Sequence, residues 1–418
     1  MEIIEKIKKI YEKDDLDIAI DYVYKSFDKF KLYYNNFKNE FKNDFELCKK
    51  CKLPEYNRDF LWFIYLDILP YDQPSSWKKI ITDLRSDYLI LKKGLMTKDI
   101  EDFINLNQEK GGEEYNKFEQ KINPEDFDLL ELIKIDVERT YQNMELFQKD
   151  KIKRIMVYVL FIYSKKYPLL GYKQGMNDLC AIFLYVLFKE YKLTTSFTKE
   201  EYSFLYYIFH SNNQFLENDV YIIYSSFMNK GIGELYLYTQ YKQNKLSTTP
   251  LEKKILLTKE EIDNYEDSLI NKRIYHIFYR LLKNFDVEFY NELINNVEPE
   301  YFLFKWYLCF FTREFSINNV IHIWDLIFCY EFIENKLIPS DNEYHFRLAD
   351  SISISMILCC KNDLMKSKSN STFLDILMHY PENIKIDQII KEALKIDSVL
   401  NPDKPINKKD SSEIEFFE

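Results

Sequence analysis

Two side chains in this sequence, Arg139 and Gln174, are of the types that together assist the hydrolysis of GTP. A guanidinium neutralises the charge that develops on the phosphate oxygens during phosphoryl transfer to water, and a glutamine amide positions the attacking water molecule. Neither type of side chain exchanges protons near neutral pH, so neither would serve as a general base. The pair would therefore act through position and charge alone.

Each of the two residues has neighbours that could hold it in one direction. Asp136 lies three residues before Arg139 on a predicted helix, so the carboxylate and the guanidinium can meet. Arg139 also lies near the C-terminal end of that helix, where a positive charge is favoured. Gln174 lies in a short turn between Gly171 and Gly175, and glycines let the backbone turn tightly and approach another surface. We expect both side chains to project from neighbouring helix ends into one exposed groove.

Three predicted helices position these residues. The first begins after Asn123, which suits the N-cap, with Pro124 at the first helical position and an apolar stripe at helical spacing behind it. The second covers about 151–165 and is stopped by Pro168, and the third runs from about 176 to 188. The whole chain of 418 residues has only 7 Gly and 11 Pro, which favours an all-α fold with short connections.

The segments around the two residues resemble the I-x-x-D-x-x-R and Y-x-Q-G motifs of the TBC-domain family of Rab GTPase-activating proteins. They extend from Ile133 to Arg139 and from Tyr172 to Gly175, in the order that the family has. Upstream, Arg58 and Trp62 resemble the R-x-x-x-W element of the family. Its late W…REF…WD signature is similar to three downstream segments, Lys305-Trp306, Arg313-Glu314-Phe315 and Ile323-Trp324-Asp325. The resemblance covers roughly residues 45–397.

This resemblance implies an all-helical, two-lobed domain with a groove that binds a Rab GTPase in its GTP form. It implies that Arg139 and Gln174 enter the partner's nucleotide site, the glutamine replacing the Rab's own, with Asp136, Tyr172 and Gly175 orienting and supporting them. The chain would be a GTPase activator that hydrolyses no GTP alone. It would hold no cofactor, because GTP and magnesium belong to the Rab.

Two phrases, Tyr172–Met176 and Leu377–Pro381, are most similar to the endosomal, retromer-associated member of the family. This similarity implies a cytoplasmic protein that reaches endosomal membranes through its partners, with an endosomal coat complex as a further partner. No signal-peptide pattern follows Met1, and the longest apolar runs, 156–163 and 179–188, are too short to cross a bilayer. A net charge of −11 argues against a dedicated nucleic-acid binder.

Composition divides the chain into one TBC domain and two flanking segments. Residues 1–44 show helical spacing with many charges and are predicted to form an N-terminal helical extension, whereas 398–418 is a polar, acidic tail predicted to be disordered. Within the domain at 45–397, the segments 93–123 and 190–270 are polar or irregular. We interpret both as variable insertions.

The cysteines do not indicate a metal site. Cys48 and Cys51 form a C-x-x-C pair, but a zinc site would need two more ligands at suitable spacing and none follows nearby. The other five cysteines are scattered, mostly inside apolar stretches, as is typical of reduced core thiols. We therefore expect no metal.

Simpler interpretations of the same residues remain open. A pair such as Asp136 and Arg139 is more often an exposed helical salt bridge, and Gln174 alone would be a polar loop residue. Two other classes of function also remain: a catalytically silent TBC scaffold that binds a Rab or a coat complex, and a purely structural helical interaction protein. The presence of both Arg139 and Gln174 favours the activator.

Overall fold

The computed structural model describes residues 44–53, 58–71, 73, 76–106, 113–194, 215–237, 269–337, 345–366 and 370–401. All regular structure within these ranges is helical. The prediction of an all-α fold is therefore confirmed. The predicted extension at 1–44, apart from Asp44, and the predicted tail beyond Asn401 lie outside the described residues.

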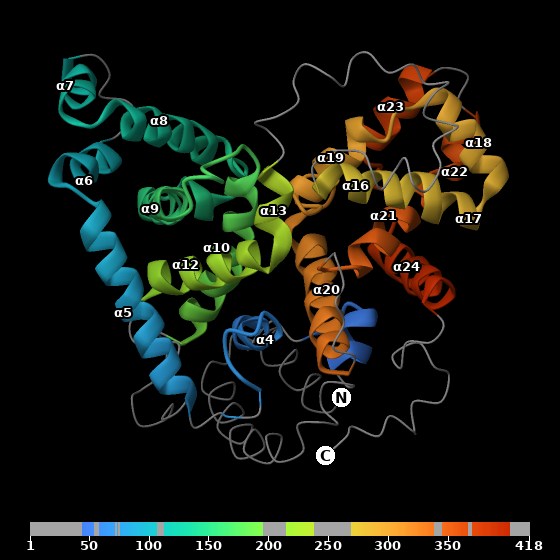
Figure 1. The fold of residues 1–418 in the computed structure, drawn as a ribbon, viewed down its shortest axis with the longest axis horizontal. Helices are drawn as coiled ribbons and strands as arrows, with labels where there is room; N and C mark the ends of the chain where they lie inside the picture. The colour runs from blue at the N-terminus through green and yellow to red at the C-terminus, as the bar shows by residue number, and fades with distance from the viewer. Residues whose placement is uncertain are drawn as a thin grey trace.

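The described residues up to 237 supply the helices on the left and in the centre of Figure 1. They are α4 (Arg58–Tyr65), α5 (Trp77–Leu95), α6 (Lys98–Asn105), α7 (Glu113–Lys121), α8 (Pro124–Arg139), α9 (Asp150–Lys166), α10 (Met176–Thr194), α12 (Leu216–Phe227) and α13 (Gly233–Leu235). A short 3₁₀-helix, Glu145–Gln148, precedes α9, and a π-helical segment, Met228–Ile232, joins α12 to α13.

The described residues from 269 onward form the group on the right of Figure 1, with α20 between the two groups. Its helices are α16 (Leu269–Tyr275), α17 (Lys283–Phe285), α18 (Val287–Asn296), α19 (Glu300–Leu308), α20 (Ile317–Leu337), α21 (Leu348–Cys359), α22 (Lys361–Lys366), α23 (Asn370–Met378) and α24 (Ile386–Leu400). A π-helical segment, His276–Leu282, links α16 to α17. The two-lobed arrangement expected from the resemblance is visible in this view.

The helix that carries Arg139 begins as its sequence predicts. Asn123 caps α8 by accepting a hydrogen bond from the backbone N–H of Glu125 at 2.9 Å, and Pro124 occupies the first helical position. Helix α9 matches its predicted range within a residue at each end, whereas α10 continues six residues beyond the predicted end at 188. The apolar periodicity therefore located all three helices.

Helices also occupy parts of the segments that we interpreted as irregular insertions. Within 93–123, α6 and α7 form because Phe103 and its neighbours bury an apolar stripe against α8, where Phe103 and Phe127 lie 5.0 Å apart between ring centroids. Within 190–270, α12 is almost wholly buried. Long-range packing stabilises these helices even though their flanking sequence is polar.

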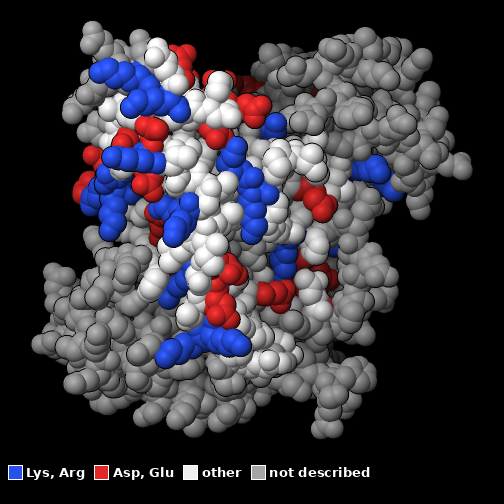
Figure 2. All heavy atoms as spheres, turned by 60° about the vertical axis from the view of Figure 1, so that its left-hand side comes forward, with Lys and Arg blue, Asp and Glu red and all other residues white. Residues whose placement is uncertain are grey.

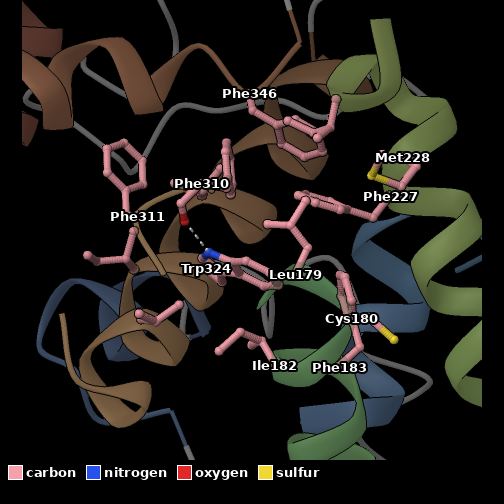
Figure 3. Packing of buried hydrophobic residues seen from close by; sticks show 14 of the residues in the cluster. Leu179, Cys180, Ile182, Phe183, Phe227, Met228, Phe310, Phe311, Trp324 and Phe346 are labelled. Atoms are coloured by element: carbon pink, nitrogen blue, oxygen red, sulfur yellow. Dashed lines mark hydrogen bonds between the residues drawn. The ribbon is translucent and has the colours of Figure 1, made fainter. Parts of the chain in front are cut away.

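An aromatic core joins the two lobes (Figure 3). The indole of Trp324 on α20 lies 5.1 Å from the ring of Phe183 on α10 and 5.3 Å from that of Phe227 on α12. Its Nε1 donates a hydrogen bond to the carbonyl oxygen of Phe310 at 3.0 Å, so the buried indole N–H is satisfied. This core fixes α10, which begins directly after the Gln174 turn.

Two motif elements that are far apart in sequence meet beside this core. Arg58 Nε donates to both carboxylate oxygens of Asp325, at 3.0 and 3.1 Å, and Trp62 Nε1 donates to Oδ1 of the same residue at 2.8 Å. All three side chains are buried, so the ion pair is satisfied by hydrogen bonds on both oxygens. The R-x-x-x-W and W-D elements noted in the sequence are therefore structural partners.

No helix within the described ranges has both the length and the apolar character needed to cross a membrane. Figure 2 shows the face formed by the left-hand helices of Figure 1, where Lys and Arg are interspersed with Asp and Glu. On this face, basic side chains therefore lie among acidic ones.

Candidate functional site

Arg139 is the last residue of α8 and its side chain is exposed. The backbone N–H of Thr140 donates a hydrogen bond to the carbonyl oxygen of Val137 at 3.1 Å, which ends the helix. Tyr141 follows with a backbone conformation in the left-handed region, at φ +43°. The chain therefore turns sharply away immediately after Arg139. Within the described part of the chain, the guanidinium makes no hydrogen bond or ion pair.

Gln174 lies in the turn between α9 and α10, and it is also exposed. Gly171 and Gly175 adopt φ values of +61° and +103°, which L side chains rarely adopt, so both turns depend on glycine. A Cβ at position 175 would also lie 3.2 Å from the Sγ atom of Cys309. The Gln174 amide has no hydrogen-bond partner among the described residues.

The expected ion pair between Asp136 and Arg139 does not form. Asp136 is buried, and its Oδ2 accepts a hydrogen bond from the hydroxyl of Tyr172 at 2.9 Å. The i, i+3 spacing allows contact on an isolated helix, but Asp136 faces the protein interior while Arg139 faces solvent. Any support that Asp136 gives to Arg139 must therefore pass through the backbone of α8 and not through a direct contact.

The same hydrogen bond joins the two segments that carry the candidate residues, because Tyr172 belongs to the Gln174 turn and Asp136 to α8. Burial raises the pKa of the Tyr172 hydroxyl, and the charge of Asp136 raises it further. The hydroxyl therefore stays protonated and remains a donor to the carboxylate. The bond between Tyr172 and Asp136 holds the turn against the last turn of α8.

Asn177, the second residue of α10, adds a second link between these segments. Its Oδ1 accepts from the backbone N–H of Gly175 at 3.0 Å, and its Nδ2 donates to Oγ1 of Thr140 at 2.9 Å. Thr140 in turn donates to the carbonyl oxygen of Asp136 at 2.8 Å. The amide oxygen and the amide nitrogen of this buried asparagine therefore both have hydrogen-bond partners.

A segment of the second lobe contacts both α10 and the residues that follow α8. Arg313 Nε donates to Asp178 Oδ2 at 2.7 Å, and the hydroxyl of Tyr141 donates to the carbonyl oxygen of Thr312 at 3.4 Å. Burial raises the pKa of the Asp178 carboxyl although Arg313 lowers it. The site therefore lies where the two lobes meet.

Three of these residues, Thr140, Asn177 and Asp178, were not singled out from the sequence. A signal was present, since Asn177 and Asp178 are adjacent polar residues at the start of a helix that is otherwise apolar for several turns. The contacts that join them to other segments span 37 positions, from Thr140 to Asn177, and 135 positions, from Asp178 to Arg313. Local sequence patterns do not reveal contacts between residues so far apart.

The described residues offer no group of His, Cys, Asp and Glu side chains that could hold a metal ion. Cys48 is buried and Cys51 is partly buried. The arrangement presents one exposed guanidinium and one exposed amide on adjacent, internally braced segments. Such an arrangement can stabilise charge and orient water in a site supplied by another molecule.

Comparisons with known proteins identify the family to which the chain is similar. A family model described as the Rab-GTPase-TBC domain matches residues 74–250 and 253–365. The chain is 27% identical over 373 residues to TBC1 domain family member 5 of Homo sapiens, a match spanning 86% of this chain and 44% of that protein. It is 25% identical over 196 residues to GTPase-activating protein GYP1 of Saccharomyces cerevisiae, spanning 46% of this chain and 26% of that protein.

Among solved structures, the Ypt/Rab-GAP domain of Gyp1p has the same fold, with a TM-score of 0.60 at 17% identity. That match covers 86% of this chain and 93% of the crystallised one. The chain spans less than half the length of the curated relatives named above. Because the family model covers well over half of the sequence, the chain belongs to the Rab-GTPase-TBC domain family.

Proposed function

We propose that this chain is a GTPase-activating protein for a Rab-family small GTPase, to which it supplies Arg139 and Gln174. The observation that carries the proposal is their shared setting. Both side chains are exposed, neither bonds to a described residue, and the segments that bear them are joined by the buried links of Tyr172 and Asn177. Exposed polar side chains on rigidly held segments are suited to act in a partner's site.

The chemistry follows from the types of the two residues. Arg139 would neutralise charge on the phosphate oxygens in the transition state, and Gln174 would orient the attacking water in place of the Rab's own glutamine. GTP and Mg²⁺ would come with the Rab. The chain would bind the Rab in its GTP form, and the names of its relatives, which include a GTPase-activating protein, support this assignment.

The exposed face of α8 offers a docking surface beside Arg139. Leu132 and Ile135 are 47% and 42% exposed, and with Arg139 they lie at i, i+3 and i+7 on one face. Leu132 is about 10 Å from Arg139 along the helix, so a GTPase whose nucleotide reaches Arg139 would also cover this face. Two aliphatic side chains covered in this way would contribute to affinity.

We further propose that the chain acts at endosomal membranes through its partners, an endosomal coat complex among them. The proposal rests on the similarity of 172–176 and 377–381 to the endosomal, retromer-associated member of the family. The 27% identity to TBC1 domain family member 5 supports it.

The test is single-turnover GTP hydrolysis by a panel of purified Rabs, with and without the full chain. Acceleration of at least one Rab is expected, with binding of the same Rab in its GTP form. If a Rab binds in its GTP form but its GTP hydrolysis is not accelerated, the chain is a catalytically silent scaffold. If no Rab in the panel is either bound or stimulated, the chain is a structural helical interaction protein.

The docking surface has a test of its own. Leu132→Glu should raise KM for the stimulated Rab and leave kcat nearly unchanged. Ile90→Glu is the matched control, because Ile90 is 68% exposed on α5 and lies outside this surface. Equal effects of the two substitutions would reject the surface without affecting the assignment of Arg139 and Gln174.

A further inference from the structure

The side chain of Asn177 contacts the residues that directly follow Arg139 and Gln174. Its Nδ2 donates to the hydroxyl of Thr140 at 2.9 Å, and its Oδ1 accepts from the N–H of Gly175 at 3.0 Å. Thr140 and Gly175 are each one position after a candidate catalytic residue. One buried amide therefore connects the positions that follow the two candidate residues.

We infer that Asn177 is a positioning residue that fixes the separation between Arg139 and Gln174. The inference rests on the proposed function for its catalytic meaning, but the geometric link stands by itself. The Tyr172 hydroxyl makes a second link to α8 through Asp136, three residues before Arg139, and it also donates to Oδ1 of Asn177 at 3.3 Å. Within the described ranges, Asn177 is the residue whose side chain joins the two positions adjacent to the projecting side chains.

The residue type fits the task closely. The link needs a donor toward Thr140 and an acceptor toward Gly175 on one short side chain, and an asparagine amide supplies both. An aspartate would lack the donor, and a serine would be too short to span both partners. Because Asn177 is only 4% exposed, water competes weakly for its partners.

Loss of this link should affect the chemical step more than docking. Arg139 and Gln174 must reach one phosphate and one water at the same time, and a misplacement of about 1 Å can reduce a rate by about 10²-fold. The exposed face of α8 with Leu132 and Ile135 would be unchanged, so affinity for the Rab should persist. The expected signature is a lower kcat at nearly constant KM.

The experiment uses the full chain and a Rab that the wild-type chain stimulates. Asn177→Ser should lower kcat by roughly 10- to 100-fold at nearly unchanged KM. Asn218→Ser is the matched control, because Asn218 is also 4% exposed, lies in the first turn of α12 and donates to the carbonyl of Arg85 at 3.2 Å. The control should lose comparable thermal stability and keep its kcat.

A second pair of variants tests the other end of the link if Asn177→Ser folds poorly. Thr140→Val removes the hydroxyl that Asn177 contacts and should lower kcat, whereas Thr140→Ser keeps a hydroxyl and should restore most of it. Hydrogen exchange gives a readout independent of activity. In Asn177→Ser, the amide of Gly175 should exchange several-fold faster than in wild type and in Asn218→Ser.

Two results would overturn the inference. One is a kcat loss no greater in Asn177→Ser than in Asn218→Ser, and the other is unchanged exchange at Gly175. If the wild-type chain stimulates no Rab, the proposed function fails, yet the exchange measurement still decides whether Asn177 holds the turn. Failure of the link and failure of the activity are therefore distinguishable.

Discussion

Replacing Arg139 by alanine should remove the acceleration of GTP hydrolysis and leave the fold intact. The guanidinium is exposed and bonds to no described residue, so the free energy of unfolding should change by no more than about 0.5 kcal/mol. An arginine supplied to a GTPase site is worth about 10³ to 10⁵ in rate, or about 4 to 7 kcal/mol of activation free energy. The expected change in activation free energy is roughly ten times the expected change in the free energy of unfolding. The Arg139→Ala variant can therefore show a loss of catalysis without a loss of stability.

The assay pairs single-turnover hydrolysis with urea unfolding of the same protein sample. Arg139→Lys should be nearly as inactive as Arg139→Ala, because an ammonium cannot make the planar two-donor contact of a guanidinium. Arg154→Ala is the control, since Arg154 is a surface arginine on α9 that bonds Asn105 at 3.1 Å and lies outside the site. Near-full activity of Arg139→Lys, or equal losses in the Arg139 and Arg154 variants, would refute the reasoning.

Four further predictions concern the surroundings of Arg139. A Rab that lacks its own catalytic glutamine should still be stimulated by the wild-type chain but not by Gln174→Ala. If the wild-type chain does not stimulate this Rab, Gln174 has no catalytic role and is only a residue of the turn. Tyr172→Phe keeps the buried ring but leaves the Asp136 carboxylate without its donor, so urea unfolding should show a loss of about 1.5–3 kcal/mol. Gly175→Ala meets both a φ of +103° and a thiol 3.2 Å from the new Cβ, so it should lower thermal stability and kcat together. Burial lowers the pKa of Lys134 to about 8, below the value of about 10.4 in an unfolded chain. Between these two pKa values the unfolded state binds more protons than the folded state. The free energy of unfolding of wild type should therefore rise relative to that of Lys134→Met as pH rises from about 8 to about 10, and a pH-independent difference would contradict this.

Local patterns in the sequence predicted the helices and the positions of the candidate residues. The cap at Asn123 and the apolar stripe of α8 depend on residues within a few positions of each other. Such local features can be predicted from the sequence without knowledge of the tertiary structure. The glycines around Gln174 predicted a turn for the same reason. The structure confirms α8 and the turn, while the catalytic roles of Arg139 and Gln174 stay predictions.

The long-range contacts that hold the site together could not be predicted from local sequence patterns. Spacing allowed Asp136 to meet Arg139, but spacing does not say which face of α8 is buried or what lies against it. Tyr172, 36 positions later, approaches Asp136 from the interior and takes the role of partner. Packing also explains α6 and α7, since their burial against α8 is invisible in a polar local sequence.

The residues proposed to act in the partner and the residues that stabilise the chain form two separate sets. Arg139 and Gln174 make no bond to described residues, so within the described structure only the backbone to which they are attached positions them. Beneath them, Asp136, Tyr172 and Asn177 are buried polar groups with hydrogen bonds, and removing one partner would leave another unsatisfied. Substitution of the exposed pair should therefore produce a stable, inactive chain, whereas substitution of the buried set should reduce stability and activity together. A stable chain that binds a Rab in its GTP form without accelerating hydrolysis is thus the expected product of losing Arg139 or Gln174, and this is how an activator of this fold could be converted into a scaffold.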